Sequence, residues 1–185
     1  MKLASHLTIK GGHLLINGLD CTLLAEKYGT PLYVTSEDRV VGQFERYKKA
    51  FGARYPKVQV LFAAKANGNL ALMRALAQKG AGADVFSSGE LHLALEAGMP
   101  PEKLLFNGSS KTPADLHLAV AKDVKVSLDS LDELHQLDAT AKAAGKTVKV
   151  SFRVNPALDV PTHPKIATGL ATSKFGIPHG QIPAA

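Results

Sequence analysis

The segment VQVLFAAKANG, residues 58–68, decides the fold that we predict for this chain. It is a nearly continuous apolar run that ends in Lys65 and in the turn pair Asn67-Gly68. Such strands are buried on both faces, as in a parallel sheet covered by helices. Four similar runs follow at residues 83–86, 103–106, 124–128 and 148–154, and one precedes it at 31–34. From residue 58 onward, the spacing of about 20–25 residues is the size of a βα unit, so we predict an α/β fold.

The stretches between the runs predict helices. The clearest one places Val40, Phe44, Tyr47 and Phe51 on one helical face. Capping signals mark the helix starts: Ser36 is an expected N-cap, and Ser-x-x-Glu patterns predict capping boxes at Ser87 and Ser130. Five strands fit either a doubly wound sheet or part of an eight-stranded barrel, which takes about 250 residues.

The two ends of the chain lie outside this rhythm. Near the start, apolar residues flank Gly11-Gly12, which predicts a hairpin, and residues 20–28 predict a short helix. At the other end, residues 175–178 resemble the end of a strand and 182–185 the first turn of a helix. We therefore expect the natural protein to continue beyond residue 185.

Composition excludes several classes of protein. The chain has 185 residues, a formal net charge of +6 and 45% apolar residues, which is typical of globular proteins. No run reaches the roughly 18 apolar residues of a membrane helix, and no apolar signal core follows the N-terminus. A single cysteine excludes an internal disulfide and fits a reducing cytoplasm. Although the pI is about 9.4, the basic residues are scattered, so no nucleic-acid partner is expected.

The strand ends carry the candidate site residues. Lys65 follows a buried strand, and desolvation there would depress its pKa and free its amine to form a Schiff base. Alternatively, the side chain extends to solvent. Asp84 lies in an apolar run and needs a partner, while Arg153 is a candidate partner for a carboxylate. Glu90 fits a site acid and a capping-box residue equally well.

Other chemistries find no support in the sequence. None of the seven histidines has a zinc-site spacing such as HExxH, and no GxSxG motif is present, so neither a metal site nor serine hydrolysis is predicted. Residues 107–111 lack the Walker pattern and are predicted to form a loop. Residues 163–169 and 173–176 form a polar, glycine-bearing pair, typical of a long loop over a barrel mouth.

Several motifs in order resemble one specific family. They are YGTPLYV at 28–34, AKAN at 64–67, GADV at 82–85, SGEL at 88–91, RVNP at 153–156, HxxIxTG at 163–169 and SKFG at 173–176. In this order and spacing they resemble the diaminopimelate decarboxylase family, which belongs to the alanine-racemase-like, pyridoxal-phosphate-dependent barrel enzymes (fold type III). The resemblance covers nearly the whole chain, from about residue 7 to residue 180.

The resemblance implies a fold and a reaction. Residues 34–185 would form the first five or so units of a pyridoxal-phosphate-binding (β/α)8 TIM-type barrel, and residues 1–33 an N-terminal segment of a β-rich second domain. Lys65 would be the Schiff-base lysine, with Asp84, Glu90 and Arg153 around the cofactor. The activity would be decarboxylation of meso-2,6-diaminopimelate to L-lysine and CO2, the last step of lysine biosynthesis, by a cytoplasmic homodimer acting on a small amino acid.

The resemblance also implies what this chain lacks, and it leaves alternatives. Family members are about twice as long, and their further cofactor and partner-subunit residues would follow residue 185, so this chain alone is expected to be inactive. The alternatives are a decarboxylase of ornithine, arginine or carboxynorspermidine, a non-catalytic decarboxylase-like regulator, and a small lysine-dependent aldolase. The Gly-Thr-Pro and HxxIxTG motifs favour the diaminopimelate branch.

Overall fold

The computed structural model describes residues 3–163 and 166–185 and forms two compact units, residues 1–58 and 59–185. Pro164 and Lys165, in the predicted loop 163–169, lie outside the described residues. No helix within the described ranges is long and apolar enough to cross a membrane. The sequence-based division at residue 33 concerns the domain to which each segment would belong in a family member, and it stays a prediction.

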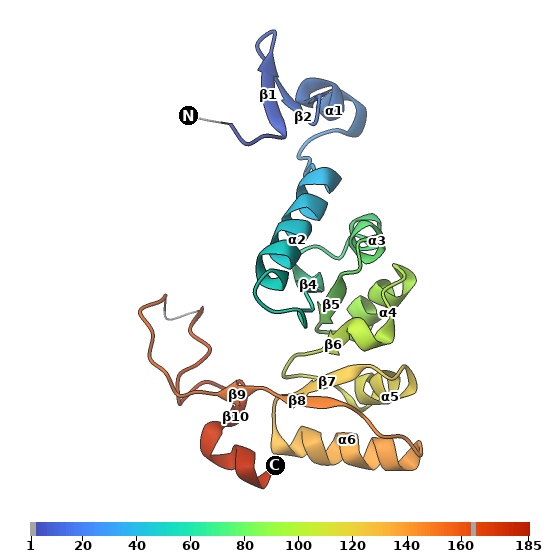
Figure 1. The fold of residues 1–185 in the computed structure, drawn as a ribbon, viewed down its shortest axis with the longest axis vertical. Coiled ribbons are helices and arrows are strands. Elements are labelled where there is room, and N and C mark those ends of the chain that lie inside the picture. The colour runs from blue at the N-terminus through green and yellow to red at the C-terminus, as the bar shows by residue number, and fades with distance from the viewer. Residues whose placement is uncertain (1–2, 164–165) are drawn as a thin grey trace. The chain divides into compact units, whose positions relative to one another are not determined.

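The first unit contains the predicted hairpin and two helices (Figure 1). Its elements are β1 (Leu7–Lys10), β2 (His13–Ile16), β3 (Leu19–Asp20), α1 (Cys21–Tyr28) and α2 (Glu37–Gly52). The three strands form an antiparallel sheet in the order β1-β2-β3. Gly11 and Gly12, at φ 60° and 84°, make the turn between β1 and β2 in a backbone region that favours glycine.

The prediction of a strand at residues 31–34 is wrong. The segment has no regular secondary structure, and the Tyr33 side chain is 99% exposed. An extended segment becomes a strand when its backbone groups pair with a neighbour, and no described segment pairs with this one. Its β-branched and aromatic residues therefore gave a misleading signal.

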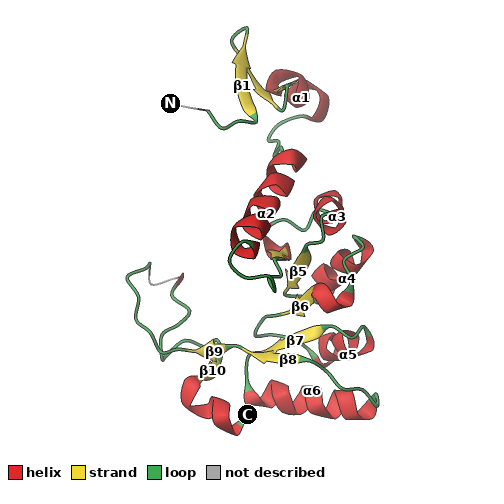
Figure 2. Cartoon of the chain, viewed as in Figure 1, coloured by secondary structure: helices red, strands yellow, loops and turns green. Residues whose placement is uncertain are grey.

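The second unit is built on the predicted parallel sheet, with strand order β4-β5-β6-β7-β8. The strands are β4 (Leu61–Ala63), β5 (Gly82–Val85), β6 (Leu104–Phe106), β7 (Lys125–Leu128) and β8 (Val150–Phe152). The helices between them are α3 (Leu70–Gln78), α4 (Ser88–Glu96), α5 (Pro113–Ala121) and α6 (Leu131–Ala143). These four helices follow one side of the sheet (Figures 1 and 2), as in part of a barrel wall.

Burial alternates along β5 and β6. Val85 and Phe106 are fully buried, whereas Asp84 and Leu105, which pair with each other, are partly exposed. Successive side chains of a strand point to opposite faces, so the helices cover one face and leave the other accessible. The expectation that both faces are buried is therefore confirmed for the helix-covered face and is wrong, within the described residues, for the other face.

Three helices, α2, α4 and α6, begin with a serine cap. Ser36, Ser87 and Ser130 each accept a backbone N–H from their own helix, as predicted. The predicted capping boxes at Ser87 and Ser130 differ in one respect: Glu90 and Glu133 accept the N–H of the residue before the cap. A complete capping box occurs instead at Thr112, with Asp115, at the start of α5.

After β8 the chain forms a second, two-stranded sheet. The short strand β9 (Val154–Asn155) pairs in parallel with β10 (Ile177–Pro178), and a 3-10 helix, His179–Ala184, follows. The Ile177 N–H donates to the Arg153 carbonyl at 2.7 Å. This pairing brings the SKFG segment, residues 173–176, beside the end of β8.

Candidate active site

Each of the five parallel strands is followed within two residues by a polar or aromatic side chain. These residues are Lys65, Phe86, Asn107, Asp129 and Arg153, after β4, β5, β6, β7 and β8 in turn. Because the carboxyl ends of parallel strands meet at one edge of the sheet, these side chains share that edge. In barrels this is the edge where catalytic residues gather.

Lys65 stands on a single 3-10 turn, Ala64–Ala66, that ends β4. Its Nζ lies 4.3 Å from the centre of the Phe86 ring, a cation–π contact between adjacent strand ends. Within the described part of the chain its ammonium group forms no hydrogen bond or ion pair. Of the two alternatives that the sequence left open, desolvation and extension to solvent, the structure favours the second, because the residue is exposed. The amine is accordingly accessible to a small molecule.

Asp84 lies on β5 and carries a buried oxygen without a partner. Among the described residues, its Oδ1 is buried and has no hydrogen-bond donor. Burial raises the pKa of this carboxyl, while the Asn107 side chain and the positive charge of Lys65 oppose that rise and the negative charge of Glu90 adds to it. A buried acceptor without a donor is costly, so this position is suited to a group that the protein chain does not supply.

Glu90 shows how the two interpretations of its pattern combine. Its Oε2 accepts the Phe86 N–H at 2.7 Å, and its own N–H donates to the Ser87 hydroxyl at 3.2 Å. The carboxylate therefore fixes the backbone of the residue whose ring contacts Lys65. Glu90 holds the end of β5 while its charge acts on Asp84.

Arg153 belongs to a second cluster at the same edge. Its Nη1 donates to Asp129 Oδ1 at 3.2 Å, and its guanidinium lies 4.6 Å from the centre of the Phe175 ring. Asp129 is 7% exposed, and its Oδ2 accepts the Gly176 N–H at 3.1 Å. The carboxylate partner expected for Arg153 is thus Asp129, which follows the adjacent strand.

The structure therefore brings three of the four predicted site residues together. Lys65, Asp84 and Glu90 interact through Phe86 and through their charges, whereas Arg153 has its own partners. The sequence analysis did not identify Asp129. This residue directly precedes the Ser130 capping pattern, and that stretch was interpreted as a helix start. The signal that could have found it is the one that identified Lys65, a charged residue directly after an apolar strand.

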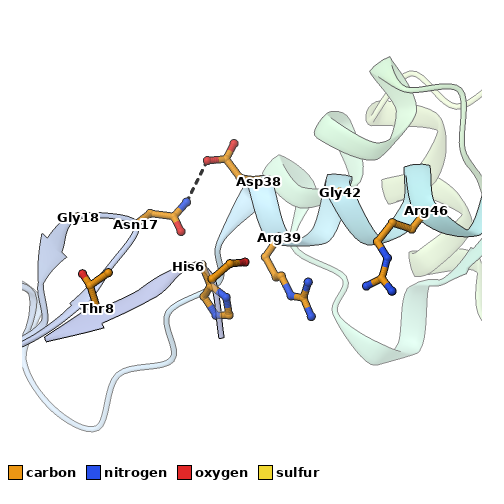
Figure 3. Close-up of a pocket in the computed structure, with 9 residues that line it drawn as sticks. His6, Thr8, Asn17, Gly18, Asp38, Arg39, Gly42 and Arg46 are labelled. Atoms are coloured by element: carbon orange, nitrogen blue, oxygen red, sulfur yellow. Dashed lines mark hydrogen bonds between the residues drawn. The ribbon is translucent and has the colours of Figure 1, made fainter. Parts of the chain in front are cut away.

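A separate cavity of about 570 Å³ lies in the first unit, between the hairpin and α2 (Figure 3). Its lining residues are Ser5, His6, Thr8, Asn17, Gly18, Asp38, Arg39, Gly42 and Arg46. Asn17 donates to Asp38 Oδ2 at 3.0 Å and ties the hairpin to the start of α2. The lining holds no nucleophile paired with a base. Nor do the residues described by the structure contain a cluster of three metal-binding side chains.

Comparisons with known proteins show which proteins this chain resembles. A family model described as the pyridoxal-binding domain of pyridoxal-dependent decarboxylases matches residues 37–184. A diaminopimelate decarboxylase from Archaeoglobus fulgidus is 50% identical over 171 residues, which are 92% of this chain and 40% of that protein. The chain thus spans about two fifths of the length of the curated relatives it matches.

Solved structures extend the likeness to three dimensions. A diaminopimelate decarboxylase from M. jannaschii in complex with L-lysine superposes with a TM-score of 0.87 at 41% identity, covering 96% of this chain and 42% of that one. A lysine/ornithine decarboxylase from Vibrio vulnificus has a TM-score of 0.58 at 24% identity over 70% of this chain, which shows the fold alone. The second unit is accordingly part of a fold-type III barrel.

Proposed function

Because this chain belongs to the pyridoxal-dependent decarboxylases and matches their pyridoxal-binding domain, we propose that it is the cofactor-binding part of an enzyme that converts meso-2,6-diaminopimelate to L-lysine and CO2. In this reaction the substrate loses one carboxylate as CO2, and the same carbon gains a proton. The observation that carries the proposal is the accessible Lys65 amine beside Asp84, whose buried Oδ1 has no donor within the described residues.

The residues fit pyridoxal phosphate. The aldehyde of the cofactor requires a primary amine that is not held in an ion pair, and Lys65 provides one. When bound, the cofactor withdraws the electrons that remain on the substrate carbon as CO2 leaves. The unpartnered oxygen of Asp84 would accept a donor from the bound molecule.

The chain's own groups would prepare this site in three ways. Lys65 would hold the cofactor covalently through Nζ, and the Phe86 ring would limit where that nitrogen can lie. Glu90 would keep the Phe86 backbone in place through its 2.7 Å hydrogen bond. Because burial raises the pKa of Asp84, its carboxyl holds a proton to a higher pH than an exposed aspartate does. Arg153 would supply a positive charge on the same edge.

Substrate identity can be tested directly on the natural full-length protein. With pyridoxal phosphate present, we expect CO2 release from meso-diaminopimelate with a kcat/KM at least about 100-fold above that for ornithine, arginine or carboxynorspermidine. A preference for one of these other substrates would overturn the substrate that we propose, while the proposed reaction class, decarboxylation, would stand. Absence of cofactor binding and of CO2 release from every substrate would instead favour a regulatory relative.

Asp84 gives a second test, based on its pKa. In the cofactor-free full-length protein, we expect Asp84→Asn to raise the free energy of unfolding near neutral pH. The folded-state pKa of Asp84 lies above its unfolded value. The carboxylate therefore lowers stability as pH rises from the unfolded pKa through the folded one, and the neutral asparagine avoids this loss.

Urea unfolding of both proteins over a pH series measures this effect. The higher free energy of unfolding of the variant should fall to the wild-type value below about pH 4, because there the aspartate is protonated in both the folded and unfolded states. Asp159→Asn, at an exposed position, should leave the midpoint close to that of the wild type. A difference in midpoint that is independent of pH would contradict the assignment of the effect to Asp84 ionisation. Pyridoxal phosphate should bind more weakly to Asp84→Asn than to the wild type.

The assembly expected from the resemblance, a cytoplasmic homodimer, stays a prediction. So does the assignment of residues 1–33 to a β-rich second domain.

A further inference from the structure

Lys111 is a fully buried lysine that the proposed reaction does not use. Its side chain has 0% exposure, and its Nζ donates to the Ser127 carbonyl at 2.9 Å, to the Gly108 carbonyl and to Glu133 Oε1 at 2.9 Å. These three partners use all three donors of the ammonium group. Lysine is almost never fully buried without a charge partner, so the pair with Glu133 is a built feature of the fold.

The contacts of Glu133 continue beyond this pair. Its Oε1 accepts from Lys111, while its Oε2 accepts the Asp129 N–H at 2.8 Å. The Asp129 carboxylate in turn accepts from Arg153 on one oxygen and from the Gly176 N–H on the other. A continuous series of contacts therefore runs from the loop after β6, through the start of α6, to the end of β8.

We propose that Lys111 and Glu133 are positioning residues for Arg153 and that they act through Asp129. The pair fixes the backbone of Asp129, and that backbone sets the direction of the carboxylate that holds the Arg153 guanidinium. The Phe175 ring also contacts the Arg153 guanidinium, at 4.6 Å from the ring centre. This inference rests on the proposed function in one respect: it takes Arg153 to be part of the cofactor site.

The charges of this series balance, and three of the four side chains that carry them are buried or nearly so. Lys111 and Arg153 supply two positive charges, and Glu133 and Asp129 supply two negative ones. Buried ion pairs contribute little stability compared with apolar residues of similar volume, because their desolvation offsets their attraction. Apolar side chains would pack the same space, but they would not direct the Asp129 N–H and carboxylate. Orientation is therefore the property that the charged pair adds.

Glu133→Gln tests the proposal with little change in shape. A carboxylate accepts on both oxygens, whereas an amide has one acceptor and one donor end. The variant therefore loses either the Lys111 contact or the Asp129 contact. In the cofactor-free full-length protein, we expect the amides of residues 173–177 to exchange with deuterium about tenfold faster, while those of α3 keep their wild-type rate. The dissociation constant for pyridoxal phosphate should rise about tenfold.

The matched control is Asp123→Asn, which removes a carboxylate from another lysine pair. Lys146 Nζ lies 2.9 Å from Asp123 Oδ1, just before β7 and thus at the opposite end of that strand. The control should leave both readouts at their wild-type values. Lys111→Met removes the other member of the pair and gives a second test. It should accelerate deuterium exchange at the same amides.

Two results would overturn the proposal. One is exchange that rises evenly over the whole chain in Glu133→Gln, because this indicates a purely structural role. The other is unchanged exchange at residues 173–177 in both variants. The exchange measurement needs no cofactor. A wild-type protein that fails to bind pyridoxal phosphate would therefore contradict the proposed function, while the exchange rates would still decide the positioning role.

Discussion

Lys65→Ala in the natural full-length protein is expected to lower the rate of CO2 release from meso-diaminopimelate by a factor on the order of 10³ or more, because the covalent attachment of the cofactor is lost. The fold should persist, since Lys65 is exposed and forms no hydrogen bond or ion pair within the described residues. Thermal unfolding should therefore stay close to that of the wild type. A variant that retains most of its activity would exclude Lys65 as the attachment site.

Borohydride trapping identifies the attached lysine independently of turnover. Protein incubated with pyridoxal phosphate is reduced and digested, and the labelled lysine is located by mass spectrometry. We expect the label at Lys65 in the wild type and its loss in Lys65→Ala. The matched control is Lys27→Ala, because Lys27 also makes a cation–π contact, at 5.2 Å from the Tyr28 ring. Label spread over many lysines and unchanged in Lys65→Ala would argue against this site.

Gly82→Ala is expected to lower the free energy of unfolding by at least about 3 kcal/mol. A Cβ at this position would lie 1.9 Å from the Lys103 carbonyl oxygen and 2.6 Å from Leu61 Cδ2. The first of these is a backbone atom directly before β6, so relief requires β5 and β6 to move apart. For a chain of this size the melting temperature should fall by about 10 °C.

Gly89→Ala is the matched control for this stability measurement. Gly89 lies in the first turn of α4, and an added Cβ would meet the Ser87 hydroxyl oxygen at 3.8 Å, an ordinary contact distance. Alanine favours helix over glycine, so the control should be neutral or stabilised by up to about 1 kcal/mol. Equal melting temperatures for the two variants would show that β5 and β6 can move apart without loss of stability.

Patterns in the sequence predicted the elements that depend on local chemistry. The apolar runs at residues 58–64 and 83–86 became β4 and β5, and the helical spacing after Ser36 became α2. These predictions succeeded because a strand buried under helices and an amphipathic helix each require a regular pattern of side chains. The run at residues 31–34 failed because strand formation also requires a partner, which composition does not reveal.

The candidate site was predictable in part. The position of Lys65 at a strand end followed from the apolar run before it, and the approach of Asp84 followed from the parallel order of β4 and β5. The choice between the two alternatives for Lys65, desolvation and exposure, was not predictable, because it depends on which face of the sheet the helices cover. The pairing of Arg153 with Asp129 was equally hidden, since these residues are 24 positions apart in sequence.

The sequence by itself determined the βα rhythm, the helix starts and the lysine at the end of the first long apolar run. These features depend on residues that are neighbours along the chain, and their ordered motifs sufficed to indicate the family. Only the tertiary structure decided that Asp84 has a buried oxygen without a donor among the described residues, and that Lys111 reaches Arg153 through Glu133 and Asp129. Such contacts join segments far apart in sequence, and their directions are set by the packing of parallel strands and not by any local pattern.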